Sequence, residues 1–93
     1  MKNKNIHQIR VKLDKVDIQI LKLIKKRSLL VDRVLRLKKS KKEIIDQKRI
    51  SFILKRVHKF SVQAKVDPEI TTKIWKVMIQ GFINYEYKKF KKK

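Results

Sequence analysis

The chain has 93 residues, with 28 Lys and Arg against 8 Asp and Glu, so its formal net charge is +20. A single Gly excludes the Gly-rich loops that bind phosphate groups. The absence of Cys excludes disulfide frameworks, zinc–thiolate sites and thiol catalysis. Because no apolar run approaches the roughly 18 residues of a membrane span and no signal peptide is recognisable, we expect one soluble, cytoplasmic domain over residues 1–93.

The positive charge by itself suggests a nucleic-acid partner, because phosphates attract Lys and Arg. However, 22 of the 28 basic residues are Lys and only 6 are Arg, the residue that makes the forked contacts typical of base recognition. Aromatic residues are few, and along the sequence they do not alternate with basic residues as a single-strand-binding surface requires. A basic helical nucleic-acid-binding or scaffold protein is therefore the less favoured hypothesis.

The hydrophobic periodicity predicts an all-α fold of three helices. The first, from about Ile6 to Lys39, has no breaker, and its apolar positions are three or four residues apart: Ile9, Leu13, Val16, Ile20, Leu23, Leu30, Val34 and Leu37. The second covers about residues 44–61. The third opens at Asp67-Pro68-Glu69, where Asp67 can cap the helix and Pro68 suits its first position, and it runs to about Tyr87. We expect residues 88–93 to form a disordered basic tail.

The length of the first helix predicts a partner chain. A helix of about 34 residues is about 50 Å long, whereas a globular chain of this size has a radius of gyration of about 12–13 Å. Two shorter helices cannot cover both of its ends, so we expect an intertwined helical homodimer. The alternative is a pair of shorter helices with a break near Ser28.

Charged residues interrupt a second stripe of the first helix, which again repeats every three or four residues: Ile6, Arg10, Leu13, Asp17, Ile20, Ile24, Arg27, Val31, Val34 and Lys38. A charge on a buried face is costly unless it is paired or binds something, so these residues favour an internal site for an anion. The simpler alternative is that each side chain reaches the solvent at the rim.

The other two helices carry fewer candidate residues. Asp46 and Arg49 share one side of the second helix, where a surface ion pair is the simpler alternative, and Glu86 lies one turn beyond Phe82, where a solvated helix end is the simpler alternative. His7 and His58 do not have the spacing of metal ligands, so no metal site is expected.

These residues, in this order and at this spacing, resemble the all-α chorismate mutases over nearly the whole chain. The run Ile9–Asp17, with its Arg10, resembles the start of that family's first helix, and Arg27 and Lys38 follow at the family's spacing. Asp46-Gln47-Lys48-Arg49 is similar to the Asp-x-x-Arg that opens the second helix, and Val66-Asp67-Pro68 is similar to the approach to the third.

The resemblance implies rearrangement of chorismate to prephenate without a cofactor or a covalent intermediate. It implies that Arg10 is donated by the partner chain and that Arg27 and Arg49 clamp the substrate carboxylates. Lys38 would donate to the ether oxygen, Asp46 would help to position the hydroxyl end of the substrate, and Glu86 would take the place of a second donor that is often Gln. A carboxylate can donate only when it is protonated, so we expect Glu86 to act in its neutral form.

Two further positions depart from the family pattern. Ile50 stands where a Glu commonly follows the Arg of the second helix, and Phe82 stands where a small polar residue is common. Both features also resemble isochorismate pyruvate lyase, which uses the same fold and basic clamp. That lyase is the alternative activity, and we prefer the mutase because the Asp46–Arg49 and Val66–Pro68 segments look more like those of mutases.

Overall fold

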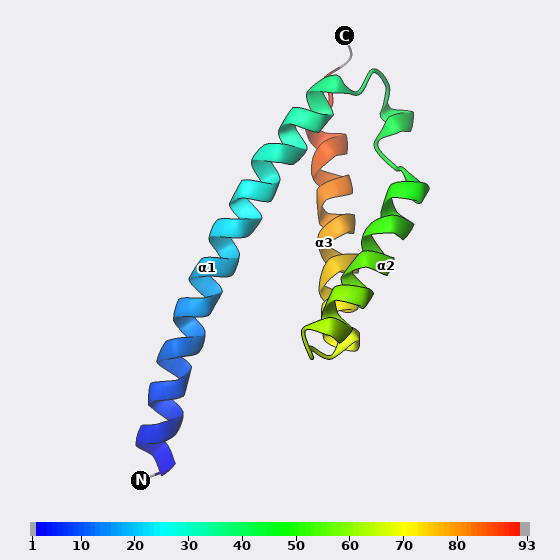
Figure 1. Cartoon of the computed structure of the whole chain (residues 1–93). Coiled ribbons are helices and arrows are strands. Elements are labelled where there is room, and N and C mark those ends of the chain that lie inside the picture. The colour runs from blue at the N-terminus through cyan, green and yellow to red at the C-terminus, as the bar shows by residue number, and fades with distance from the viewer. Residues whose placement is uncertain (1, 92–93) are drawn as a thin grey trace. The chain divides into compact units, whose positions relative to one another are not determined.

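The computed structural model describes residues 2–91, with side chains from residue 5 onward, and within this range it is all-α. Its three helices are α1 (Lys2–Leu37), α2 (Gln47–Gln63) and α3 (Pro68–Lys89), and a short 3₁₀ turn, η1 (Lys41–Glu43), follows α1 (Figure 1). This confirms the predicted fold class and the long N-terminal helix. No helix among the described residues is long and apolar enough to span a membrane.

The helix bounds differ from those predicted by a few residues. α1 begins earlier and ends two residues sooner than expected, and α2 begins at Gln47 because η1 takes up the segment before it. Lys88 and Lys89, which we placed in the tail, are helical residues of α3. The last two residues of the expected tail, 92 and 93, lie outside the described residues.

The first of two compact units, residues 1–31, consists of the long N-terminal part of α1. The helix is continuous through Ser28, so the alternative of a break at this residue is wrong. The apolar stripe predicted from the sequence is 47–65% exposed at six positions of this unit: Ile9, Leu13, Val16, Ile20, Leu23 and Leu30. Apolar side chains are therefore exposed along the length of this part of α1 in the single chain.

The second unit, residues 32–93, contains the last turns of α1 together with η1, α2 and α3. α2 packs against α3, and Figure 1 shows the two helices antiparallel, joined by a short turn. The core of this unit is small: Leu35, Ile44 and Ile83 are buried, and three half-buried residues pack around them, namely Ile50, Ile79 and Phe90. Most of the burial in this unit therefore surrounds the junction of α1, η1 and α3.

Polar contacts join the elements of the second unit to one another. The Tyr85 hydroxyl of α3 donates to Asp32 Oδ1 of α1 at 2.6 Å, and this bond raises the pKa of Tyr85 above its ordinary value of 10.0. The hydroxyl of buried Ser61 on α2 lies 2.7 Å from that of Thr71 on α3. Each contact satisfies polar atoms that partial burial removes from water.

Local capping explains where α2 and α3 begin. The Asp46 carboxylate accepts from the backbone N–H of Arg49 at 3.0 Å, and Asp67 does the same for Glu69 at 2.9 Å. Pro68 occupies the start of α3, which confirms the predicted opening of this helix. At the other end of α2, Lys65 takes a positive φ of 59°, a conformation that Gly adopts more readily.

Candidate functional site

The best-defined polar feature of the second unit is an ion pair between Lys38 and Glu86. Lys38 follows the last residue of α1, Glu86 lies on α3, and Lys38 Nζ donates to Glu86 Oε1 at 2.8 Å. The two side chains are 18% and 9% exposed, respectively. The structure therefore brings together two of the residues that the sequence singled out, and the alternative of a solvated helix end for Glu86 is wrong.

The Lys38–Glu86 pair is partly buried and lies at the edge of the apolar core. Glu86 lies three residues after Ile83 on α3, and Lys38 lies three residues after Leu35, so both charged residues border the small apolar core. Partly buried charges are stable only when paired, which the short contact provides. An anion that enters here would meet an ammonium group already held in place by its carboxylate partner.

A second carboxylate, Glu43, shapes the loop that carries Lys38. Its side chain accepts from the backbone N–H groups of Ser40 at 2.9 Å and of Lys39. These two bonds hold the pKa of Glu43 below its ordinary value of 4.5, and the bond from Ser40 contributes the most. Sequence reasoning missed this residue, although Ser40-x-x-Glu43 has the spacing of a capping box and could have indicated it.

Asp46 and Arg49 occupy the first turn of α2, as predicted, but their contacts differ from a surface ion pair. The Asp46 carboxylate caps the helix through the backbone N–H of Arg49. The Arg49 guanidinium lies over the ring of Phe52, 5.4 Å from its centroid. The positive end of the helix dipole adds to the basic side chains here and favours an anion.

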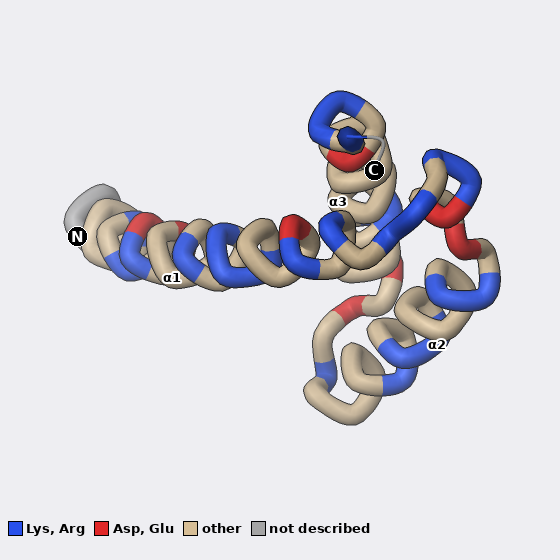
Figure 2. Tube along the Cα trace, turned by 90° about the horizontal axis from the view of Figure 1, so that it is seen from above, with Lys and Arg blue, Asp and Glu red and all other residues tan. Residues whose placement is uncertain are grey.

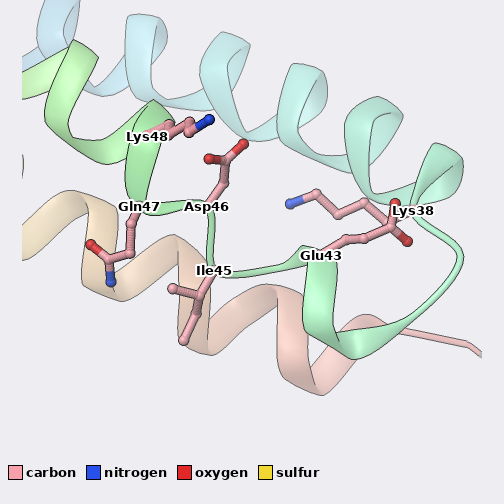
Figure 3. Close-up of a pocket in the computed structure, with 6 residues that line it drawn as sticks. All are labelled: Lys38, Glu43, Ile45, Asp46, Gln47 and Lys48. Carbon is pink, nitrogen blue, oxygen red and sulfur yellow. The ribbon is translucent and has the colours of Figure 1, made fainter.

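A pocket of about 410 Å³ lies between Lys38 and the start of α2, and six residues line it: Lys38, Glu43, Ile45, Asp46, Gln47 and Lys48. In Figure 3 the ammonium group of Lys38 points toward the start of α2, where Asp46 and Lys48 lie. The volume falls within the range of small-molecule sites. Two predicted site residues, Lys38 and Asp46, therefore line one open surface pocket, whereas Arg49 and Glu86 are not among its lining residues.

The remaining predicted site residues, Arg10 and Arg27, belong to the first unit. Arg27 is half-buried, whereas Arg10 is exposed. Their roles in binding stay predictions. The two departures from the family pattern are both half-buried: Ile50 packs against the core cluster, and Phe82 lies on α3 beside Ile83.

Among residues 2–91, no group of three or more His, Cys, Asp or Glu side chains is placed to hold a metal ion. The pocket of the second unit is lined by the charged residues Lys38, Glu43, Asp46 and Lys48, and the Lys38 ammonium group is held by Glu86. Such an arrangement suits the binding and electrostatic stabilisation of an anionic molecule.

Comparison with known proteins agrees with this chemistry. The family model for chorismate mutase type II matches residues 9–87, a segment that includes every predicted site residue from Arg10 to Glu86. No curated protein and no solved structure shows significant similarity to the chain. Because the match covers most of the chain and agrees with its all-α fold, the chain belongs to the chorismate mutase type II family.

Proposed function

We propose that the protein rearranges chorismate to prephenate. In this reaction one ether C–O bond breaks while one C–C bond forms, and negative charge develops at the ether oxygen in the transition state. An enzyme needs only to hold the reactive conformer and to place donors at that oxygen. The observation that carries the proposal is the Lys38–Glu86 pair beside a pocket of suitable size, in a chain of this family.

In the proposed mechanism Lys38 donates to the ether oxygen, and Glu86 holds the ammonium group in position before the substrate binds. Because Glu86 already accepts from Lys38 Nζ at 2.8 Å, it acts on the substrate through that ammonium group. Arg27 and Arg49 clamp the carboxylates, because the guanidinium fork matches a carboxylate in geometry. Asp46 fixes the first turn of α2 and thereby the backbone that carries Arg49.

The exposed stripe of α1 supports a second copy of the chain as the partner. Nine positions from Ile9 to Leu37 repeat at steps of four and three, the spacing of a helix–helix seam, and only Arg27 among them is charged. A homodimer would cover this apolar surface. It would also allow Arg10 of one copy to reach the substrate of the other, as the resemblance implies.

The direct test offers chorismate and isochorismate separately to the purified protein and identifies the products. Prephenate from chorismate supports the proposal. Pyruvate and salicylate from isochorismate, with no prephenate, would instead support isochorismate pyruvate lyase, the alternative that Ile50 and Phe82 keep open. If neither substrate is converted, both activities are rejected, and the basic helical binding protein becomes the better account.

A further inference from the structure

The outer side of α2 carries a continuous set of contacts between guanidinium groups and aromatic rings. Arg49 lies 5.4 Å from the centroid of Phe52, and Arg56 lies 5.9 Å from Phe52 and 5.1 Å from Phe60. Steps of three and four residues place the four side chains along one side of the helix. On α2, aromatic and basic residues therefore alternate with the helical period, contrary to the expectation from the sequence.

We infer that Phe52 is a positioning residue for Arg49, and this inference rests on the proposed function, in which Arg49 binds a substrate carboxylate. Arg49 is exposed, and a free Arg side chain has several rotatable bonds whose freedom is lost on binding. The ring of Phe52 restricts the guanidinium before the substrate arrives. The substrate then meets a side chain that has already lost part of this entropy.

The contact with the ring leaves the hydrogen-bonding capacity of Arg49 intact. A guanidinium has five N–H donors, and a cation–π contact is electrostatic attraction to the ring rather than a hydrogen bond to an acceptor atom. The donors therefore stay available for a carboxylate. The backbone of the same residue is fixed as well, because its N–H donates to Asp46 Oδ1 at 3.0 Å.

Packing in the core does not account for Phe52. Its side chain is 50% exposed, and it is not among the residues that form or surround the cluster of Leu35, Ile44 and Ile83. It lines a surface hollow together with Lys48, Ser51 and Lys55. Figure 2 shows α2 with basic but no acidic segments, so a carboxylate side chain on α2 itself does not compete for Arg49.

The expected effect follows from the strength of such contacts. A cation–π pair at an exposed site corresponds to about a 2- to 5-fold change in a binding constant. Loss of the ring should therefore weaken substrate binding without changing the chemical step. The predicted result is a higher KM for chorismate at an unchanged kcat.

The test compares the wild-type protein with Phe52→Leu, Phe52→Trp and the matched control Phe60→Leu. Phe60→Leu removes an equally exposed ring and an Arg contact on the same helix, but this ring does not contact Arg49. We expect Phe52→Leu to raise KM by about 2- to 5-fold, Phe52→Trp to restore it, and Phe60→Leu to leave it at the wild-type value. An equal rise in Phe60→Leu, or a fall in kcat alone in Phe52→Leu, would overturn the inference.

A second readout does not depend on turnover. The Nε–H proton of Arg49, assigned by its absence in Arg49→Lys, should show a ring-current shift in the NMR spectrum that Phe52→Leu abolishes and Phe60→Leu retains. If wild-type protein turns over chorismate but Phe52→Leu leaves this resonance unchanged, the positioning role alone is rejected. If the wild-type protein shows the shift but no turnover, the proposed function fails and the positioning role fails with it.

Discussion

The Lys38–Glu86 pair places one cation and one anion at the edge of a small apolar core, beside a pocket of about 410 Å³. With side chains 18% and 9% exposed, neither group is well solvated, so each depends on the other for stability. The pairing restricts the position of the Lys38 ammonium group before a ligand arrives. A donor to a developing negative charge needs such a fixed position.

Also at the scale of single residues, Glu86→Gln tests how Glu86 contributes. Gln has nearly the same shape, but it lacks the charge that pairs with Lys38 Nζ. If Glu86 acts by holding Lys38 in position, kcat for chorismate should fall in Glu86→Gln while KM changes little. Prephenate formation measures both constants, and a kcat equal to or above that of the wild-type protein would show that Lys38 does not need this carboxylate.

At the scale of elements, the segment from Lys38 to Arg49 is ordered mainly by its own backbone contacts. Glu43 closes the loop after α1, and Asp46 caps α2 three residues later, so the two carboxylates fix the chain on either side of Ile44 and Ile45. The pocket lies against this segment. Its shape therefore depends on two local hydrogen-bonding motifs more than on the core.

The first prediction for this segment concerns Glu43. Because its pKa is lowered in the folded protein, its carboxylate stabilises the fold above its ordinary value of 4.5, and this contribution is lost as the pH falls through the folded-state pKa. The stability difference between the wild-type protein and Glu43→Gln should be largest near neutral pH and should shrink below about 4.5. Urea unfolding across this range measures it, and a difference that grows on acidification would contradict the assignment.

A second prediction at the scale of elements concerns the turn between α2 and α3, where Lys65 has a φ of 59°. The N–H of Val66 donates to the carbonyl of Ser61 at 2.9 Å, so this left-handed residue ends α2 in the manner usually served by Gly. Lys65→Gly should raise the free energy of unfolding by about 0.5–1 kcal/mol, since Gly adopts this conformation without strain. Chemical unfolding at matched protein concentration tests it, with Lys59→Gly, inside α2, as the control that should destabilise.

At the scale of the whole molecule, the first unit exposes apolar side chains along its length, while the described part of the second unit buries three large apolar ones, Leu35, Ile44 and Ile83. Such a chain buries little surface by itself, and stability in small domains follows the surface buried. In the proposed homodimer, the second copy would supply the missing burial. The +20 charge does not prevent this at physiological salt, because repulsion between exposed charges is screened over about 8 Å.

The proposed dimer can be tested through one position of the apolar stripe. Leu23→Lys places a charge at the middle of the stripe, where its side chain is 65% exposed in the single chain, and we expect it to yield monomers or unfolded protein. Ile18→Lys replaces a comparably exposed apolar residue, 52% exposed, on the opposite side of the helix, so it should retain the dimer. Light scattering after gel filtration measures the mass, and a dimeric Leu23→Lys variant would contradict the seam.

How far the sequence predicts this molecule depends on the range of each interaction. The Asp67–Pro68 opening and the continuous α1 follow from local rules, and the structure confirms both. The meeting of Lys38 and Glu86 has no local signal, because the residues are 48 positions apart, and only the resemblance to the family suggested it. The Arg49–Phe52 contact depends on side-chain rotamers that residue spacing does not determine, and the Glu43 bonds depend on the turn of the loop after α1, although the Ser40-x-x-Glu43 spacing is local.

The central claim is that Lys38 stabilises the transition state, and one comparison of variants tests it most directly. Prephenate formation is measured for the wild-type protein, Lys38→Ala and Lys42→Ala, an exposed Lys in the same loop, after circular dichroism and mass measurements show equal folding and assembly. Loss of a donor at a developing oxyanion costs about 10²- to 10³-fold in rate. We predict a loss of this size in Lys38→Ala and none in Lys42→Ala, whereas wild-type turnover by a folded Lys38→Ala protein would contradict the account.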